Sequence, residues 1–401
     1  NITNVPPLRF PGFTDEWKRV KVSDLLDFYS TNSLSWEMLN YEGGDILNLH
    51  YGLIHSGLPT LIDLKKDILP FVNETAKPKK FTLCKEGDIA FADASEDTND
   101  VAKAVEFINL DGQQVVGGLH TIHGRDNENK TVLGFKGYAF ASSAFHNQIR
   151  RIAQGTKIYS ISSKSFDEVF IGVPTKAEQT KIARLLHIID ERITVQNKII
   201  EDLKKLKSAI IDRHFNGLNA NRRIGELIHE VSNRNKMNTN LPVLSVSNRQ
   251  GFIAQSEQFE NRIVASDDTS KYKIVVKNDF AYNPARINVG SIARLTNIES
   301  GIVSPMYICF RCTDELLPEY LELFFQSRYF QTEVGKRLEG SVRQCLSIDG
   351  IKSIQFDLIS VPQQSTLADR LTIIQSELNN EETIGRLYQR QRKYLLSQLF
   401  I

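Results

Sequence analysis

The feature that most constrains the fold of this chain is an internal repeat. Residues 178–215 and 363–400 align without a gap at an offset of 185, so that Gln179 falls on Gln364. A Val-Pro step precedes each copy, and a proline at this place is typical of a helix start. A duplication of this kind indicates that one structural unit is present twice.

Each copy of the repeat has apolar residues at near-heptad spacing, no proline, and mainly Lys, Arg, Glu and Gln between them. This pattern predicts a long helix with one narrow apolar seam. The alternative is an amphipathic helix that packs only on its own domain, but two copies of more than thirty residues favour a mutual coiled coil. The residues expected in the coiled coil are Ile182, Ile189, Ile193, Gln196, Leu203 and Ile210 in the first helix, and Leu367, Ile374, Glu381, Ile384, Tyr388 and Leu395 in the second.

The duplication also predicts how the two helices pair. One helix after each of two equivalent domains gives an approximate two-fold axis, and this axis makes the helices antiparallel. A register in which paired residue numbers add to 577 places Leu206 on Leu371 and Gln196 opposite Glu381. A polar central layer of this kind costs stability but can fix the register.

Upstream of each helix the repeat continues more weakly, as in residues 86–91 and 277–282. Each half contains a helical stretch and several short alternating runs separated by Gly, Asn and Asp, which indicate strands and turns. The expected helical stretches are 138–153 and 318–338, and the expected strands include 46–49, 88–91, 243–246, 274–276 and 302–310. The predicted fold class is therefore α+β: two mixed α/β domains in tandem, 1–173 and 217–361, each followed by a long helix, 174–216 and 362–401, with pseudo-two-fold symmetry.

Composition places the chain among ordinary globular proteins, with 401 residues, 41% hydrophobic residues and a formal net charge of +1. No run of eighteen apolar residues suggests a membrane span, and residues 1–13 lack the layout of a signal peptide. Four unevenly placed cysteines suit a reducing compartment. These features predict a cytoplasmic protein without a membrane partner.

Motifs for catalysis are weak or missing. The sequence has neither a GxxxxGK[ST] phosphate loop nor a GxGxxG fingerprint, and residues 283–286 (NPAR) lack the second proline and the aromatic residue of an adenine methyltransferase motif. Cys309 and Cys312 supply only two of four zinc ligands, and His120 and His123 have no cysteine or carboxylate cluster beside them. We therefore predict no catalytic residue, no metal and no cofactor in this chain.

Binding chemistry is the remaining possibility, and its candidates are polar and cationic residues in expected loops. Arg, Asn and Gln can bind the edges of guanine and adenine, while Lys and Ser can position phosphates. Each residue alone is equally well explained as a solvated loop residue, so the grouping carries the prediction; Trp17 and Trp36 fit better as core anchors. The candidate DNA contacts are Asn48, Tyr51, His55, Ser95, His120, Arg125, Arg150 and Lys157 in the first half, and Ser247, Asn248, Arg249, Asn283, Arg286, Ser304, Tyr307, Arg343 and Gln344 in the second.

The sequence resembles the specificity subunits of type I restriction-modification systems. Residues 8–13 (LRFPGF) are similar to the start of many such subunits, while 281–286 (AYNPAR) and 303–307 (VSPMY) look like parts of their target-recognition domains. The two Val-Pro steps with their long helices look like the two spacer regions of the family. The duplicated order of domain and helix is more specific than any of these short motifs.

This resemblance implies that each domain reads one half of a split site in double-stranded DNA. It also implies that the helices set the spacing and bind two modification subunits, which hold S-adenosylmethionine and methylate adenine, and that restriction subunits join to cleave. The weak net charge then indicates a local DNA-facing strip, or phosphate neutralisation by the partners. A stand-alone DNA methyltransferase or nuclease and a coiled-coil scaffold without a DNA role remain the competing classes.

Overall fold

The protein was analysed as a computed structural model that describes residues 4–77, 80–248, 250–255, 268–340 and 344–401. The predicted Arg249 and Arg343 lie outside these residues. The chain forms two compact units: unit 1 comprises residues 1–197 and 384–401, and unit 2 comprises residues 198–383. The long helices α5 (Lys176–His214) and α10 (Val361–Gln398) each contribute a part to both units.

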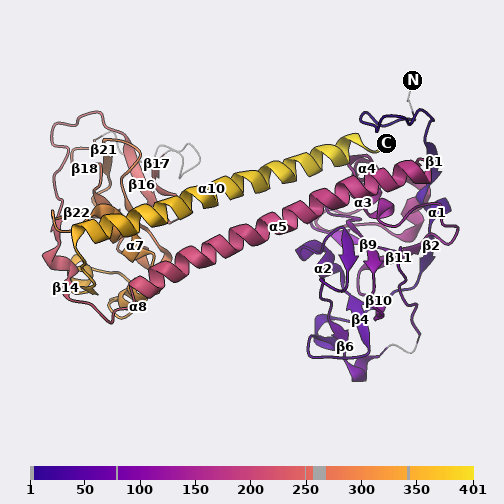
Figure 1. Ribbon diagram of the computed structural model, residues 1–401, viewed down its shortest axis with the longest axis horizontal. Helices are drawn as coiled ribbons and strands as arrows, with labels where there is room; N and C mark the ends of the chain where they lie inside the picture. The colour runs from indigo at the N-terminus through magenta and orange to yellow at the C-terminus, as the bar shows by residue number, and fades with distance from the viewer. Residues whose placement is uncertain (1–3, 78–79, 249, 256–267, 341–343) are drawn as a thin grey trace. The chain divides into compact units, whose positions relative to one another are not determined.

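Unit 1 is built around a five-stranded sheet in the order β2-β11-β7-β9-β5 and a four-stranded sheet in the order β10-β4-β6-β3. Within the unit, β10, β4 and β6 lie on the side away from the long helices, whereas α3 and α4 lie beside them (Figure 1). Its strands are β1 (Lys18–Lys21), β2 (Asp27–Tyr29), β3 (Leu39–Asn40), β4 (Ile46–Leu49), β5 (Leu61–Asp63), β6 (Phe71–Val72), β7 (Ile89–Ala92), β8 (Ala94–Ser95), β9 (Ala104–Asn109), β10 (Gln114–Gly117), β11 (Thr121–Arg125), β12 (Tyr159–Ser160) and β13 (Phe170–Val173). Its shorter helices are α1 (Val22–Leu25), α2 (Tyr51–Ser56), α3 (Phe135–Phe140) and α4 (Ser143–Ile152).

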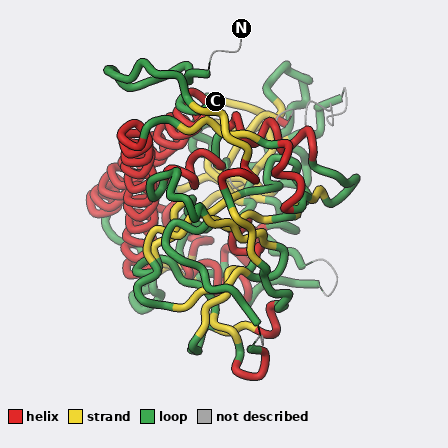
Figure 2. Tube along the Cα trace, turned by 90° about the vertical axis from the view of Figure 1, so that its right-hand side faces the viewer, coloured by secondary structure: helices red, strands yellow, loops and turns green. Residues whose placement is uncertain are grey.

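Unit 2 repeats this plan with fewer strands, in two four-stranded sheets ordered β15-β22-β19-β20 and β17-β16-β21-β18. Its strands are β14 (Arg222–Arg223), β15 (Ile228–Glu230), β16 (Val243–Ser247), β17 (Gly251–Ala254), β18 (Lys273–Val276), β19 (Phe280–Tyr282), β20 (Ile292–Arg294), β21 (Ser300–Val303), β22 (Ile308–Cys312) and β23 (Gln355–Phe356). Its shorter helices are α7 (Pro318–Phe325), α8 (Arg328–Gly335) and α9 (Ile348–Lys352). Most strands of unit 1 are short and separated by loops and turns (Figure 2).

The two units correspond strand by strand. In unit 1, β11 pairs antiparallel with both β2 and β7, and β7 pairs with β9. In unit 2, β22 pairs antiparallel with both β15 and β19, and β19 pairs with β20. Each second sheet contains one parallel pair, β10 with β4 at one edge of its sheet and β16 with β21 in the centre of its sheet. The mixed α/β units in tandem and the long helices confirm the predicted fold class.

Helix caps and a turn divide some of the elements that the sequence predicts as continuous. Ser142 caps α4 by accepting a hydrogen bond from Phe145 N, and Ser327, at the 185 offset, caps α8 by accepting one from Phe330 N. The predicted helical stretches are therefore interrupted by a cap in both units. The predicted strand 302–310 is also two strands, because a turn in which Tyr307 N donates to Ser304 O separates β21 from β22.

Buried contacts show that α5 and α10 run antiparallel within each unit. In unit 1 the start of α5, with Ile182 and Leu186, shares a core with Leu395 and Leu399 near the end of α10. In unit 2 the end of α5, with Ile211 and Phe215, shares a core with Ala368 and Leu371 near the start of α10. The domain boundaries predicted from the sequence treat each long helix as a separate segment, whereas each unit of the structure includes a part of both helices.

The 577 register is wrong. Residues in contact across the helix pair have numbers that add to 580 for Arg192 with Tyr388, 582 for Asp190 with Arg392, and 586 for Lys204 with Glu382. Leu206, expected on Leu371, is 50% exposed. Near-heptad spacing defines which side of a helix is apolar, but sliding one helix along that side leaves the pattern intact.

The seam itself differs at one expected position, because Ile384 is 37% exposed and lies outside the buried side of α10. Gln196 is buried and Glu381 is half-buried. No helix among the described residues is long and apolar enough to cross a membrane.

Candidate nucleic-acid interface

A buried carboxylate holds together the first sheet of unit 1. Asp88 accepts hydrogen bonds from Arg125 Nε at 2.8 Å and Nη2 at 2.7 Å, from His123 Nε2 at 2.7 Å, and from Lys85 N at 2.8 Å. Burial alone would raise the pKa of Asp88, but the hydrogen bonds from Arg125 and His123 outweigh it and hold this pKa below its ordinary value. Arg125, predicted as a DNA contact, is therefore a framework residue on β11 whose guanidinium is occupied by Asp88.

Unit 2 repeats this arrangement. Asp279 accepts hydrogen bonds from Arg311 Nε at 2.6 Å, from Arg311 Nη2 at 2.9 Å, and from Val276 N at 2.9 Å. Cys309 on β22 takes the place of His123 on β11, two residues before the arginine in each case. The aspartate-arginine pair was not predicted, because its members lie 37 and 32 residues apart in the two units.

Cys84, Asp88 and His123 lie close enough for one donor atom of each to face a common metal ion. Arg125 already neutralises the Asp88 carboxylate, and burial raises the pKa of the Cys84 thiol above its ordinary value. A cation here would have to displace the guanidinium. We therefore assign these three side chains to the framework of the domain.

An aromatic and histidine cluster lies at the carboxyl end of β4. The rings of Trp36 and His50 are 4.3 Å apart, and Tyr51 lies 4.8 Å from His50, 5.8 Å from His55 and 5.1 Å from His120. His50 Nδ1 accepts a hydrogen bond from Gly52 N, and this bond begins α2. Three of the predicted DNA contacts are thus brought together: Tyr51 and His55 lie on α2 rather than in a loop, and His120 lies in the turn before β11. Trp36, expected in the core, is 46% exposed at the edge of this cluster.

Asn48 lies on β4, the strand that leads to this cluster, and its side chain does not face solvent. Its side chain is fully buried on β4, and its Nδ2 donates to Asn32 Oδ1 at 3.0 Å. A Cβ on Gly118 would lie 2.2 Å from Asn48 Oδ1, so only glycine fits beside it. Asn48 lies on the buried strand β4, which matches the expected strand 46–49 and not a loop, and its contact with DNA stays a prediction.

A second group of predicted residues in unit 1 surrounds the 95–99 loop. Ser95 on β8 pairs with Tyr159 on β12, and its hydroxyl accepts a hydrogen bond from Asp97 N. Arg150 lies on α4 rather than in a loop, and its Nη1 donates to Asn99 Oδ1 at 2.8 Å. Lys157 is exposed in the loop before β12. Arg150 and Lys157 keep an exposed positive charge on this edge of unit 1.

In unit 2 the predicted residues divide into buried and exposed ones. Asn283 is 8% exposed and accepts a hydrogen bond from Ala285 N, and Tyr307 is 7% exposed and accepts one from Val246 N. Both residues are mostly buried and bind backbone N–H groups, and their contact with DNA stays a prediction. Asn248, Arg286 and Gln344 are exposed, whereas Ser247, on β16 rather than in a loop, and Ser304 are half-buried.

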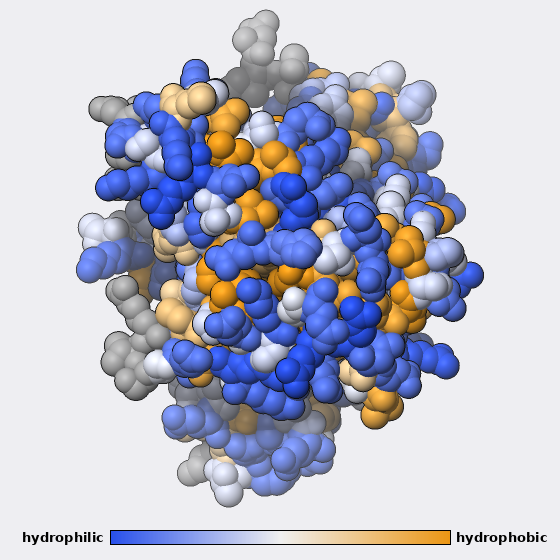
Figure 3. All heavy atoms as spheres, turned by 90° about the vertical axis from the view of Figure 1, so that its left-hand side faces the viewer, coloured by the Kyte–Doolittle hydropathy of each residue, from blue (hydrophilic) through white to orange (hydrophobic). Residues whose placement is uncertain are grey.

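Backbone hydrogen bonds bring parts of this unit 2 group together. Ser291 Oγ donates to Val246 O, which joins the end of β16 to the turn around Arg286. Leu346 N donates to Pro284 O, which brings the segment after Gln344 to the same turn. The face of unit 2 seen in Figure 3 is mainly hydrophilic, with hydrophobic side chains only in broken patches. Such a surface suits a polar ligand better than an apolar one.

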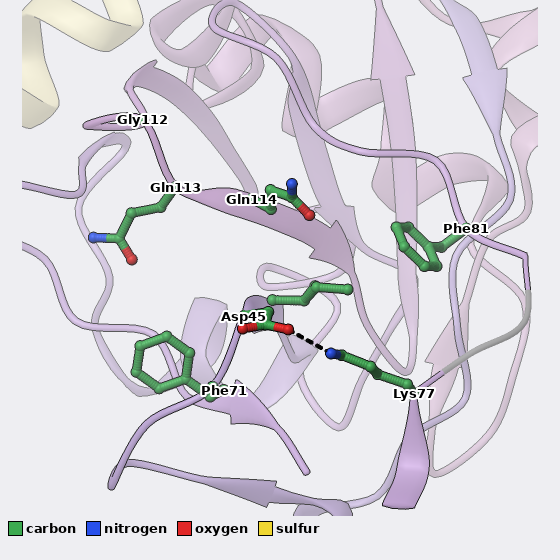
Figure 4. Close-up of a pocket in the computed structure, with 9 residues that line it drawn as sticks. Asp45, Phe71, Lys77, Phe81, Gly112, Gln113 and Gln114 are labelled. Carbon is green, nitrogen blue, oxygen red and sulfur yellow. Dashed lines mark hydrogen bonds and ion pairs between the residues drawn. The ribbon is translucent and has the colours of Figure 1, made fainter. Parts of the chain in front are cut away.

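Sequence reasoning missed an open hollow of about 630 Å³ between β4, β6 and β10. Phe71 and Phe81 lie on either side of it, and Lys77 Nζ donates to Asp45 Oδ2 at 2.6 Å (Figure 4). Gln113 and Gln114 add exposed amides to its wall (Figure 4). Aromatic faces and amides can bind nucleobases, and none of the nine lining residues is a cysteine, serine or histidine that could act as a nucleophile or base. Gln113 lies just after Asp111-Gly112, a turn signal that could have marked this segment as a loop tip.

Comparisons with known proteins agree with the resemblance noted from the sequence. Residues 14–205 match the family model described as type I restriction modification DNA specificity domain. A curated relative, the type I restriction enzyme EcoKI specificity subunit of Escherichia coli (strain K12), is 26% identical over 223 residues, which are 48% of this chain and 48% of the relative. The chain thus matches about half the length of this curated relative.

Two solved structures share the fold over nearly the whole chain. The first is the type I restriction-modification S subunit from M. genitalium, with a TM-score of 0.56 and 17% identity over 99% of each chain. The second comes from a study of complex assembly and conformational transition of the type I R-M system, with a TM-score of 0.57 and 14% identity over 98% of each chain. By sequence over residues 14–205 the chain is similar to the type I restriction modification DNA specificity domain, and by fold it is similar over nearly its whole length to the solved type I restriction-modification S subunit.

Proposed function

We propose that this chain is the DNA-reading subunit of a type I restriction-modification complex and that each unit reads one half of a bipartite site in double-stranded DNA. The observation that carries the proposal is the duplicated framework: two units with the same strand pairing and the same aspartate-arginine pair present different exposed side chains. Unit 1 presents the exposed His120 beside the half-buried Tyr51 and His55, and unit 2 presents the exposed Asn248 and Arg286. A shared frame with different surface groups is what two half-sites of different sequence require.

The long helices carry exposed apolar residues that support a second part of the proposal, the binding of modification subunits. In unit 1, Ile188 and Ile384 are 39% and 37% exposed, and in unit 2 their partners at the 185 offset, Ile373 and Ile199, are 69% and 40% exposed. Each unit therefore presents one equivalent pair of apolar side chains. Equivalent pairs suit two copies of one partner. We assign these positions to two modification subunits.

In this proposal catalysis belongs to the partners. Modification subunits would hold S-adenosylmethionine and methylate adenine, and restriction subunits would join the complex and cleave. The sequence has neither a cofactor loop nor a methyltransferase motif of its own. A stand-alone methyltransferase or nuclease is the alternative, and it predicts S-adenosylmethionine binding or DNA cleavage by the purified chain alone.

The test is an exchange of the first recognition domain, residues 1–173, for that of another family member, followed by methylome sequencing of a host that carries the complete system. We expect one half of the methylated site to change and the other half to stay the same. The reciprocal exchange of 217–361 is the matched control and should change only the other half. Loss of both half-specificities in a chimera that still assembles would contradict the proposal.

The spacing between half-sites would be set by the helices. Four residues inserted at equivalent places in α5 and α10 add about 6 Å of helix at ~1.5 Å per residue. We expect the non-specific spacer to lengthen by about one to two base pairs while both half-sites stay unchanged. A spacer of unchanged length would show that the helices do not set it.

A further inference from the structure

His120 adopts a backbone conformation that is uncommon for residues other than glycine. Its φ is 54°, in the left-handed region, where a Cβ is unfavourable and glycine or asparagine is preferred. Gly118 and Gly117 stand two and three residues earlier, yet position 120 is a histidine. A side chain held in a strained turn points to a use for that side chain.

Asp93 holds His120 at two points. Asp93 N donates to the backbone oxygen of His120 at 3.1 Å, and Asp93 Oδ1 lies 3.1 Å from His120 Nδ1. Asp93 is itself fixed, because its backbone oxygen accepts a hydrogen bond from Ile161 N at 2.9 Å. A carboxylate at Nδ1 keeps the proton on that nitrogen and sets the direction of the ring.

The opposite nitrogen, Nε2, is left for a ligand. The His120 side chain is 49% exposed, and no described residue makes a hydrogen bond to its Nε2. Tyr51 packs edge-on against the ring at 5.1 Å, and the other titratable groups of the cluster are His50 and His55. His50 Nδ1 accepts from a backbone N–H and His55 Nε2 lies 2.9 Å from Ala94 O, so both of these nitrogens are already occupied.

We infer that His120 is a specificity-determining residue of the first half-site and that Asp93 is its positioning residue. This inference rests on the proposed DNA-reading function. With the proton on Nδ1, Nε2 is a hydrogen-bond acceptor, and in the major groove it fits an exocyclic amino group, N6 of adenine or N4 of cytosine. A residue that only closed the turn would need no exposed ring, no carboxylate at Nδ1 and no histidine.

The test uses the complete complex with its modification subunits and a set of duplexes in which each base pair of the first half-site is changed in turn. His120→Asn keeps a residue that tolerates the left-handed conformation but removes Nε2. We expect discrimination at one adenine or cytosine to fall by roughly 5- to 150-fold, with discrimination elsewhere unchanged. His229→Asn in unit 2, at an exposed histidine outside the candidate interface, is the control and should change nothing.

Two further measurements separate a reading role from a structural one. Asp93→Ala should weaken discrimination at the same base pair, and Asp93→Asn should retain most of it, because an amide oxygen still accepts from Nδ1–H. A loss equal at all base pairs would overturn the inference. A wild-type complex without sequence preference would instead overturn the proposed function itself.

Discussion

The two units have ion pairs of reversed polarity between an equivalent strand and helix. Glu106 on β9 pairs with Ile89, the residue after Asp88, and Arg294 on β20 pairs with Phe280, the residue after Asp279, so the two occupy equivalent places. Glu106 makes an ion pair with Lys136 on α3 at 3.2 Å, whereas Arg294 makes ion pairs with Glu319 and Glu322 on α7. In unit 1 the acid is on the strand, and in unit 2 it is on the helix.

Other contacts do not vary in this way. Gln179 and Gln364, at the 185 offset, each accept one backbone N–H and donate to two carbonyls, using the same atoms. Backbone groups have the same polarity in both units, so the residue that binds them is the same. A pair of side chains can reverse together, because each sign compensates the other. The comparison indicates that contacts to the backbone preserve the fold while contacts between side chains are free to diverge.

The largest expected effect concerns the buried ion pair of unit 1, Lys136 with Glu106. Lys136 and Glu106 have side chains that are 4% and 0% exposed, so Lys136→Met leaves a carboxylate buried without its cation. We expect unit 1 to lose about 3–5 kcal/mol of stability. Arg294→Met should cost unit 2 about 1 kcal/mol or less, because Glu319 and Glu322 are 43% and 38% exposed and water can solvate them.

Hydrogen exchange followed by mass spectrometry measures the two losses, because peptides report each unit separately. The double variant Glu106→Gln, Lys136→Met is the control and should recover part of the loss, since it removes the unpaired charge. Equal losses in the two units would show that burial of the carboxylate does not decide how much the ion pair contributes.

The next effect concerns the shared aspartates. Asp88→Asn removes the charge from a group that binds Arg125, His123 and a backbone N–H, and we expect a loss of about 2–3 kcal/mol. Asp279→Asn should cost about 1 kcal/mol or less, because the side chain of Arg311 is 51% exposed. The lowered pKa of Asp88 means that its contribution is present above the ordinary pKa of an aspartate and is lost as the pH falls through the folded value. Melts of wild type and Asp88→Asn should therefore converge in acid, and a constant difference between them down to low pH would contradict this.

The glutamines should behave alike. Gln179→Ala and Gln364→Ala each leave one N–H and two carbonyls without a side-chain partner in a buried place, and we expect about 1–3 kcal/mol in each unit. Hydrogen exchange should give losses that agree to within about 1 kcal/mol. A large difference between the two losses would mean that identical contacts do not contribute equally to the stability of the two units.

These contacts also show what the sequence could predict. Helix spacing depends on neighbours along the chain, so α5 and α10 begin and end within a few residues of the expected positions. The placement of site residues depends on partners far away: Asn48 is buried under Gly118, and Arg125 binds an aspartate 37 residues earlier. The sequence predicts the strand 46–49 but not that its one polar side chain is buried. The grouping of Tyr51, His55 and His120 could be proposed from residue types, but Asp93 could not, since nothing local links it to His120.

The smallest expected effect concerns a histidine of unit 2 whose equivalent position in unit 1 holds a leucine. His214 at the end of α5 falls on Leu399 at the 185 offset. Its Nε2 lies 2.7 Å from the hydroxyl of Tyr320, which in turn donates to Asp357 O, and burial lowers the pKa of His214. The folded state therefore resists protonation, and unit 2 should lose stability as the pH falls below the unfolded histidine pKa of about 6.5 towards the folded value. His214→Leu copies the residue of unit 1 and should make the pH dependence of exchange in unit 2 shallower between about pH 7 and 5. Peptides of unit 1 are the internal control, because their own buried histidines are unchanged. If His214→Leu leaves the slope in unit 2 as steep as before, the acid sensitivity of that unit comes from another group.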